Sequence, residues 1–442
     1  MSGATPALQV FRGSILHCLD DPGDTLEDAN VAFYEDGLLL VAGGKVQQLG
    51  DASVLLPTLP EGIDVEDYSG KLILPGFIDS HIHFPQTDMI ASYGEQLLDW
   101  LEKYAFPSER RFVDTEHAAE VADFFLDELL RNGTTTALVL GTVHPGSVDA
   151  IFEAARTRNL RLIAGKVLMD RHCPDDLQDT PDSAYRDSET LIERWHRRGR
   201  LLYAITPRFA PTSSPAQLER VGQLAREHPD AYIHTHVAEN KAEVDWVREL
   251  FPECRSYLDV YDRYGLLRER SVFAHCIHLD RTDRERMAAT GAAMAFCPSA
   301  NLFLGSGLFD LAVAKDLGVR VGLGTDVGAG TNFCQLRTLS EAYKVTQLNG
   351  QKLAPLQALY LATLGSAKAL YLDDRIGNLA PGKEADFVVA DWRSTPLLSR
   401  RIEAASDLIE KLFALIMLGD DRAIFATHIM GRCAYRRGAA KR

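Results

Sequence analysis

The chain has 442 residues, of which 46% are hydrophobic and 25% are charged, an ordinary composition for a globular protein with a large core. Its 47 basic and 62 acidic residues give a formal charge of -15, which argues against a nucleic-acid or anionic-membrane partner. The 7 cysteines are scattered and never spaced as Cys-x-x-Cys, so we expect neither a disulfide framework nor a thiolate metal site.

Two further patterns concern location. No apolar run approaches the roughly 20 residues that a membrane-spanning helix needs. Residues 1–11 lack the basic segment and apolar run of a secretory signal. We therefore expect a cytoplasmic protein with no membrane and no nucleic-acid partner.

The first part of the chain, from about residue 9 to residue 59, has the pattern of short strands and turns. Asp36-Gly37 and Gly43-Gly44 are typical hairpin turns between apolar runs at residues 31–33, 38–41 and 46–49. This segment is β-rich and carries no cluster that suggests catalysis.

Residues 72–78 predict a buried strand, broken by Pro75-Gly76. His81 and His83 follow at positions i and i+2, and strand side chains at this spacing point the same way. Two converging imidazoles suit a divalent metal such as zinc. A polar pair that merely ends a strand is the alternative, and the pair alone is weak evidence.

From residue 72 short apolar runs alternate with longer stretches of helical spacing. Strands are predicted near residues 72–78, 134–140, 161–169, 201–206, 231–237, 271–275, 291–297 and 319–324. Helices are predicted at residues 117–130, 215–227, 240–250 and 281–289. Eight strands alternating with helices predict the α/β class and a (β/α)8 TIM-type barrel over residues 71–370.

After the barrel, helical stretches at residues 333–349 and 354–370 lead to a turn and to strands near 386–389 and 424–430. β structure therefore returns at the end of the chain. We expect residues 1–70 and 371–442 to join into a second, small β-sandwich domain.

The predicted strand ends carry three more metal-compatible side chains. His236 ends the fifth strand, His275 ends the sixth and Asp326 follows the eighth. In barrel enzymes the carboxyl ends of the strands form the active-site face, so these residues should meet His81 and His83 there. His234 shares a strand face with His236 and competes for the same role, but His236 is nearer the strand end.

Glu239 follows His236 by three residues, where the strand gives way to a helix. A carboxylate there can move a proton between water and substrate. Alternatively, Glu239 caps the first turn of the next helix, where acidic residues are common.

Several longer stretches resemble the amidohydrolase superfamily across most of the chain. These are Pro-Gly-Phe-Ile-Asp-Ser-His-Ile-His at residues 75–83 and Gly-Asn-Leu-Ala-Pro-Gly-Lys-Glu-Ala-Asp at residues 377–386. Within the superfamily the chain is similar to the guanine deaminases. The stretches that carry this likeness are residues 83–86 (His-Phe-Pro-Gln), 98–107 (Leu-Asp-Trp-Leu-Glu-Lys-Tyr-Ala-Phe-Pro), 206–209 (Thr-Pro-Arg-Phe), 236–240 (His-Val-Ala-Glu-Asn) and 324–327 (Gly-Thr-Asp-Val).

The resemblance implies hydrolytic deamination of guanine at C2, giving xanthine and ammonia, as part of purine catabolism. It implies one zinc ion per subunit and a homodimer. The residues implied to hold the zinc are His81, His83, His236, His275 and Asp326.

The same resemblance assigns roles to individual residues. Asp326 would accept a proton from the attacking water, and Glu239 would protonate N3 of the purine. Gln86 and Arg208 would hydrogen-bond the base, for which an amide and a guanidinium are fitting partners. From the chemistry of aromatic rings, and not from the resemblance, we also expect Phe209 and Trp100 to stack on the purine, although either could as easily belong to the core.

Three alternatives remain open. The substrate could be a different purine, a pterin or a triazine. The chain could be an inactive scaffold, although it keeps every ligand and Glu239. Iron or manganese could also occupy a site of histidines and an aspartate.

Two other active-site designs find no support in the sequence. Some relatives bridge two metals with a carboxylated lysine at the end of the fourth strand, but residues 202–206 contain none, so we expect one metal. Lys166 lies on the third strand and is expected to be structural. The His-x-Glu and Pro-Cys-x-x-Cys motifs of the other deaminase fold are absent.

Overall fold

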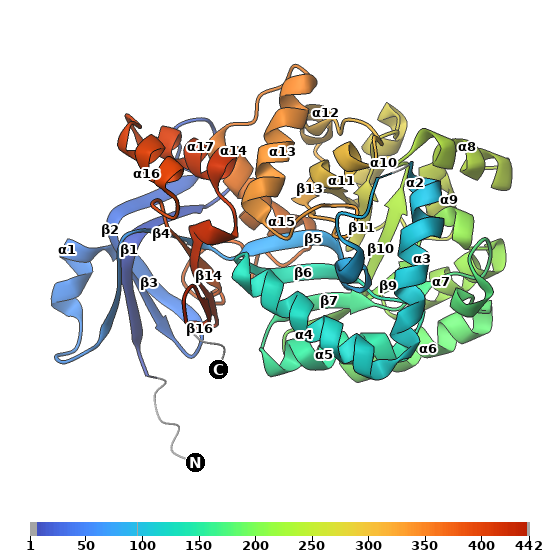
Figure 1. Cartoon of the computed structure of the whole chain (residues 1–442), viewed down its shortest axis with the longest axis horizontal. Coiled ribbons are helices and arrows are strands. Elements are labelled where there is room, and N and C mark those ends of the chain that lie inside the picture. The colour runs from blue at the N-terminus through green and yellow to red at the C-terminus, as the bar shows by residue number, and fades with distance from the viewer. Residues whose placement is uncertain (1–6, 95, 440–442) are drawn as a thin grey trace, which may run out of the picture.

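Two sheets organise the structure, a computed structural model that describes residues 7–94 and 96–439. In Figure 1 a barrel with its helices fills the right-hand side, and a sheet built from both ends of the chain lies beside it on the left. None of the helices in the described ranges is both long and apolar enough to cross a membrane.

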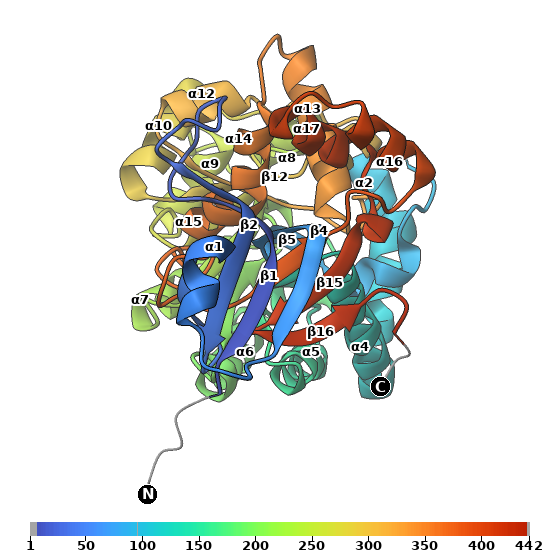
Figure 2. The same ribbon diagram turned by 90° about the vertical axis from the view of Figure 1, so that its left-hand side faces the viewer.

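The sheet beside the barrel has seven strands in the order β16-β15-β14-β4-β1-β2-β3. Its strands are β1 (Gln9–Cys18), β2 (Val31–Ala42), β3 (Lys45–Asp51), β4 (Val65–Pro75), β14 (Phe387–Ala390), β15 (Ile424–Ile429) and β16 (Arg432–Arg436). Strand β4 pairs in parallel with β1 and antiparallel with β14, which joins the two ends of the chain. Figure 2 shows this sheet from its outer side. The expected second sheet from both termini is thus confirmed, whereas the division at residues 70 and 370 stays a prediction.

The hairpin predicted at Asp36-Gly37 is wrong. Strand β2 runs unbroken through both residues, and Gly37 lies opposite Gly13 of β1. A Cβ atom on Gly37 would lie 2.9 Å from the Ile15 side chain, so glycine is required by close packing beside an irregularity in β1 rather than by a turn. The Gly43-Gly44 turn does connect β2 to β3.

The barrel strands are parallel and follow one another in chain order around the sheet. They are β5 (Phe77–His83), β6 (Thr134–Leu140), β7 (Arg161–Gly165), β9 (Leu201–Pro207), β10 (Tyr232–Val237), β11 (Ser271–His275), β12 (Ala293–Phe296) and β13 (Arg320–Leu323), with the short β8 (Val167–Leu168) beside β9. The expected α/β barrel is confirmed. Between β5 and β13 no ladder forms, and the gap is closed by the Asp326 N–H, which donates to the His81 carbonyl at 2.9 Å.

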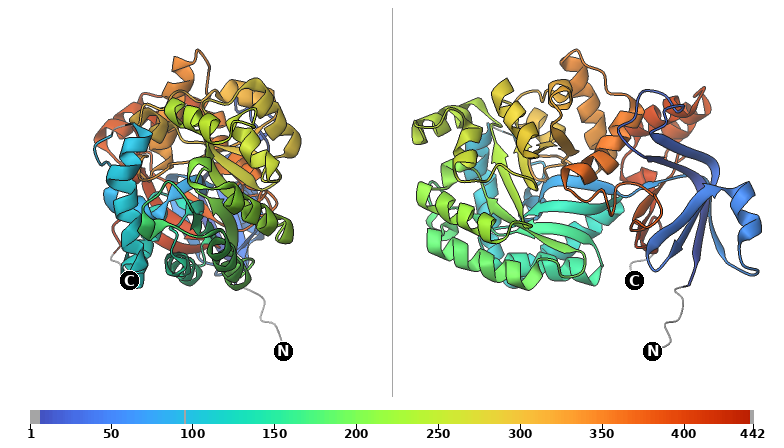
Figure 3. Two further views of the ribbon diagram at one scale, coloured as in Figure 1. Left: turned by 90° about the vertical axis from the view of Figure 1, so that its right-hand side faces the viewer. Right: turned by 180° about the vertical axis from the view of Figure 1, so that it is seen from behind.

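Helices surround the barrel, as the end-on view in Figure 3 shows. Those before β13 are α2 (Leu97–Trp100), α3 (Phe106–Glu109), α4 (Thr115–Arg131), α5 (Pro145–Thr157), α6 (Pro181–Trp195), α7 (Pro215–Glu227), α8 (Lys241–Leu250), α9 (Tyr257–Arg263), α10 (Arg281–Thr290), α11 (Pro298–Phe303) and α12 (Leu311–Asp316). Those after it are α13 (Gln335–Leu348), α14 (Pro355–Tyr360), α15 (Ser366–Ala369), α16 (Pro396–Glu403) and α17 (Leu408–Leu418), and α1 (Ala52–Leu55) lies beside β2 and β3. The apolar faces of the larger helices pack with one set of strand residues in the largest core cluster, and other residues of the barrel strands form a second cluster.

The single strand predicted at residues 72–78 is in fact two strands in different sheets. β4 ends at Pro75, and β5 begins at Phe77 and carries both histidines within it. Gly76 lies between them, where a Cβ atom would be 2.1 Å from the Thr135 hydroxyl oxygen. Pro75 and Gly76 therefore mark the point at which the chain passes from the terminal sheet into the barrel.

A buried ion cluster joins the barrel to the second sheet. Arg161 and Arg200, on or next to the amino ends of β7 and β9, pair with Glu384 in the segment that leads into β14. The Arg200 guanidinium lies 2.7 Å from Glu384 Oε2 and also pairs with Asp386. This cluster lies at the opposite end of the strands from the predicted ligands.

Candidate active site

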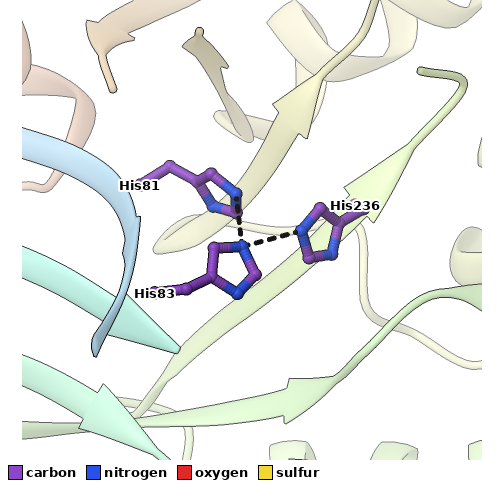
Figure 4. Close-up of side chains that lie close together, drawn as sticks. All are labelled: His81, His83 and His236. Carbon is purple, nitrogen blue, oxygen red and sulfur yellow. Dashed lines mark hydrogen bonds between the residues drawn. The ribbon is translucent and has the colours of Figure 1, made fainter. Parts of the chain in front are cut away.

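Five predicted ligands meet at the carboxyl ends of the barrel strands. His83 Nε2 lies 3.2 Å from His81 Nε2 and 3.2 Å from His236 Nε2, and Figure 4 shows these three rings facing one another. Asp326 Oδ1 is 3.2 Å from the Nε2 atoms of both His81 and His83. His275 Nε2 lies 3.7 Å from Asp326 Oδ2.

Each ligand owes its place to the strand that carries it. His81 and His83 are two residues apart on β5, so their side chains point to the same side of the strand. His236 lies on β10. His275 ends β11, and Asp326 lies just beyond β13, both with left-handed backbone at φ 70° and φ 54°. This conformation costs non-glycine residues about 1–2 kcal/mol, and here it turns the chain at the strand ends.

A second layer of groups fixes the orientation of three of the imidazoles. His81 Nδ1 contacts His234 Nε2 at 2.7 Å, His236 Nδ1 contacts the Arg208 carbonyl at 2.7 Å, and His275 Nδ1 contacts Asn301 Oδ1 at 2.8 Å. With Nδ1–H donating outward, each ring presents the Nε2 lone pair to the centre. His234, the competitor of His236, therefore lies behind His81 instead of among the converging atoms.

The electrostatics agree with a cation at this centre. Burial lowers the pKa of His83 to about 4, and it lowers the pKa values of His81 and His236 as well. Burial alone would raise the pKa of Asp326, but His81, His83 and His275 hold it well below its ordinary value. The imidazoles of His81, His83 and His236 are thus neutral and the Asp326 carboxylate is charged, which is the protonation state that metal ligands need.

The spacing also fits a metal. Bonds of about 2.1 Å at tetrahedral angles place ligand atoms about 3.4 Å apart. The measured separations of 3.2 Å between the Nε2 atoms and Asp326 Oδ1 are close to this value. In the described residues, His81, His83 and His236 form one group of potential ligands, and His81, His275 and Asp326 form another.

Glu239 points into the site and does not cap a helix. Its Oε2 lies 3.3 Å from His275 Nε2, and its Oε1 accepts a hydrogen bond from the Ser306 hydroxyl at 3.0 Å. Helix α8 is capped instead by Asn240 and Glu243. Burial, together with the charge of Asp326, raises the pKa of Glu239 to about 8, so this carboxyl can hold a proton at neutral pH.

A pocket with about 410 Å³ of empty space opens above these residues. Nine of the ten residues predicted for the site line it, and the exception is His81, which lies beneath. The nine are His83, Gln86, Trp100, Arg208, Phe209, His236, Glu239, His275 and Asp326. A concave site lined by apolar and aromatic side chains with a few converging polar groups is typical of small-molecule sites.

Gln86 and Arg208 meet on one wall of the pocket through a residue that the sequence did not reveal. The Gln86 amide donates to Glu109 Oε1 at 3.0 Å, and the Arg208 guanidinium donates to Glu109 Oε2 at 2.6 Å. Glu109 is 1% exposed and does not itself line the pocket. It lies two residues beyond the 98–107 stretch, which was the only signal that could have drawn attention to it.

The two aromatic residues proposed for the site, Trp100 and Phe209, line the pocket. Trp100 on α2 is 2% exposed, and Phe209 after β9 packs edge-on against Trp246 with ring centroids 6.4 Å apart. Stacking on a ring substrate stays a prediction for both. Two further polar residues escaped the sequence analysis: Asn301, which orients His275, and Ser306, which donates to Glu239.

Comparisons with known proteins agree with this geometry. Residues 72–434 match the model of the Amidohydrolase family. The chain is 54% identical to the guanine deaminase of Escherichia coli strain K12 over 440 residues, covering 99% of this chain and 100% of that protein.

Solved structures show the same relation. The E. coli guanine deaminase structure has a TM-score of 0.95 at 54% identity, covering 97% of this chain and 100% of that one. A guanine deaminase from C. acetobutylicum, described with bound guanine in its active site, has a TM-score of 0.86 at 26% identity, covering 97% of this chain and 100% of that one. The chain therefore belongs to the amidohydrolase family, and within that family to the guanine deaminases.

Proposed function

We propose that this chain catalyses the hydrolytic deamination of guanine at C2, releasing xanthine and ammonia. The observation that carries the proposal is the pocket itself. A ligand cluster and Glu239 lie at its floor, and the paired donors Gln86 and Arg208 lie on its wall. A relative named guanine deaminase matches this chain along essentially its whole length.

His81, His83, His236, His275 and Asp326 are the residues that would hold a divalent metal. When bound there, such an ion lowers the pKa of a coordinated water and so supplies a nucleophile at neutral pH. We propose zinc, one ion per subunit, because imidazole nitrogens with a single carboxylate suit it.

Two carboxyl groups would move the protons. As water adds to C2 of guanine, Asp326 takes a proton from that water. Glu239, protonated near neutral pH, gives its proton to N3 and so makes C2 electrophilic. Glu239, now ionised, takes the proton of the new C2 hydroxyl and passes it to the amine. The C2–N bond then breaks, ammonia leaves, and C2 becomes a carbonyl carbon of xanthine, after which the proton held by Asp326 is released and Glu239 is protonated again.

The wall of the pocket would hold the ring. Gln86 and Arg208 both present N–H donors, which match the carbonyl oxygen and ring nitrogens of guanine. Trp100 and Phe209 provide apolar faces on which a purine can stack. A base held in this way keeps C2 close to Glu239 and to the ligand cluster.

A spectrophotometric assay of the purified protein tests the proposal, with guanine run beside adenine, cytosine and a pterin. We expect guanine loss with xanthine formation, and we expect Glu239→Gln to abolish it while the metal content per chain stays the same. Turnover of a different ring amine by metal-loaded protein, without guanine turnover, would refute the assigned substrate. Absence of bound metal together with absence of activity would indicate an inactive scaffold.

We also propose a homodimer, a cytoplasmic location and a role in purine catabolism. The acidic composition and the unpaired cysteines support the location. Sedimentation of the purified protein and elemental analysis of its metal test the subunit number and the zinc assignment.

A further inference from the structure

A buried carboxylate joins the two polar groups that would hold the substrate. Glu109 is the last residue of the short helix α3, whereas Gln86 follows β5 and Arg208 follows β9. Its two oxygens are divided between them, with Oε1 at 3.0 Å from Gln86 Nε2 and Oε2 at 2.6 Å from an Arg208 guanidinium nitrogen. All three side chains are buried.

Each of the two donors has a second restraint. Gln86 Oε1 accepts from the Gly328 N–H at 3.2 Å, so the amide is fixed with its NH2 group toward Glu109. The Arg208 guanidinium lies over the Phe106 ring, 5.3 Å from the centroid. Phe106 and Glu109 are three residues apart on α3, so one face of this helix supplies both contacts to Arg208.

The charge arrangement gives a reason for a carboxylate at this position. Arg208 is buried at the wall of a pocket proposed to take a neutral base, and an unpaired buried cation there would be costly. Glu109 neutralises it from outside the pocket lining through one guanidinium nitrogen, so the other guanidinium N–H groups of Arg208 remain available to a ligand.

We propose that Glu109 is a positioning residue for substrate: it holds Gln86 and Arg208 as a preorganised pair of donors for the carbonyl oxygen of the ring. This inference rests on the proposed deamination of guanine. It extends the site to a residue that touches neither the substrate nor the ligand cluster. Preorganised donors lower the cost of binding, so removing Glu109 should act mainly on KM.

The first test compares Glu109→Gln with the wild-type protein, using guanine as the substrate. The variant keeps the shape of the side chain but loses its charge and one acceptor. We expect KM to rise about tenfold, with kcat changed by less than about threefold and metal content unchanged. Glu109→Asp, which keeps the charge on a shorter side chain, should show a smaller rise.

A competitive inhibitor makes the test specific to the carbonyl contact. 2-Aminopurine lacks the ring carbonyl oxygen, so its inhibition constant should change by less than about twofold in Glu109→Gln. An equal loss of affinity for guanine and for 2-aminopurine would overturn the proposed contact, because it would mean that the whole pocket is deformed.

A double-mutant cycle asks whether Glu109 acts through Arg208. If it does, Glu109→Gln should weaken guanine binding less in the Arg208→Ala background than in the wild type, because only the contact with Gln86 is then left to lose. Multiplicative losses would show that Glu109 acts independently, and the inference would fail.

Glu384→Gln is the matched control, since it removes another buried glutamate that pairs with arginines, at the far end of the barrel. It should lower the unfolding temperature without raising KM. The kinetics of the wild-type protein distinguish a failure of the proposed guanine deamination from a failure of the positioning role of Glu109. Guanine turnover by the wild type with an unchanged KM in Glu109→Gln would refute the positioning role alone. A metal-loaded wild type that does not act on guanine would refute the function and this inference with it.

Discussion

Asp79 of β5 and Thr325 of the segment after β13 are joined by two hydrogen bonds across the one gap in the barrel. The Thr325 N–H donates to Asp79 Oδ1 at 3.1 Å, and the Thr325 hydroxyl donates to Oδ2. Asp79 is fully buried. Since β5 and β13 are not paired by sheet hydrogen bonds, the contacts between Asp79 and Thr325 help to hold these two ends of the barrel sheet together.

Thr325→Val should therefore destabilise the fold. The substitution keeps the shape but removes the hydroxyl donor from a buried carboxylate, for which we expect a loss of about 1–3 kcal/mol in the free energy of unfolding. Urea denaturation measures it. Thr346→Val is the control, because that buried hydroxyl donates to the Tyr343 carbonyl of its own helix and not across the barrel gap. Equal midpoints for the Thr325 variant and the wild type would contradict the closing role.

His234→Phe should weaken metal binding without removing a ligand. The ring of His234 holds His81 through the 2.7 Å contact between His234 Nε2 and His81 Nδ1. Loss of such second-layer partners typically costs about 10–100-fold in metal affinity. Competition with a chelator measures the affinity, and His228→Asn, at the end of α7, serves as a control. Unchanged affinity would leave His234 as a packing residue only.

Arg208→Lys should impair guanine turnover although the charge is conserved. The compact ammonium of lysine cannot keep both the Glu109 contact and the cation–π contact with Phe106. We expect kcat/KM for guanine to fall at least about tenfold, with the metal content per chain unchanged. Normal kinetics in Arg208→Lys, and also in Arg208→Ala, would remove this residue from the substrate site.

His428 should make the second sheet sensitive to acid. Its ring stacks on Phe387 with centroids 4.3 Å apart, and its Nε2 lies 2.8 Å from the Tyr68 hydroxyl. Burial lowers the pKa of His428 to about 4, below its ordinary value of 6.5. The unfolded chain therefore binds more protons between these values, so stability is full above about pH 6.5 and falls as the pH drops toward 4.

At pH 5 this pKa difference corresponds to about 2 kcal/mol of lost unfolding free energy. Comparison of His428→Gln with the wild type at pH 7 and pH 5 isolates the contribution, because the other histidines are common to both. The variant should lose less stability between the two pH values. A difference between the two proteins that does not change with pH would show that His428 is not the titrating group.

Features governed by local rules could be predicted from the sequence. The i, i+2 spacing of His81 and His83 and the positions of His236 and His275 at strand ends follow from strand alternation and barrel architecture. The local turn signal at Asp36-Gly37 failed because close packing against Ile15 explains that glycine equally well.

Relationships across the fold could not be predicted. Glu109 is 99 residues from Arg208 in the sequence, and no local pattern around Glu109 predicts that it forms an ion pair with Arg208. The left-handed backbone at His275 and Asp326 is equally invisible, because neither residue type requires it. In both cases the tertiary structure imposes what the local pattern leaves free.

The order of strands in the terminal sheet has a consequence for synthesis. In this sheet β4 lies between β1 and β14. During synthesis β4 can pair with β1 at once, but β14 is translated more than 300 residues later. Until then the Leu72–Leu74 edge of β4 has unpaired backbone groups on an apolar strand, the kind of surface that invites wrong pairing. A ribosome-bound chain can thus assemble much of its barrel early, but it leaves this edge open until residues 387–390 emerge, which makes that stage of synthesis the point at which a holding chaperone would matter most.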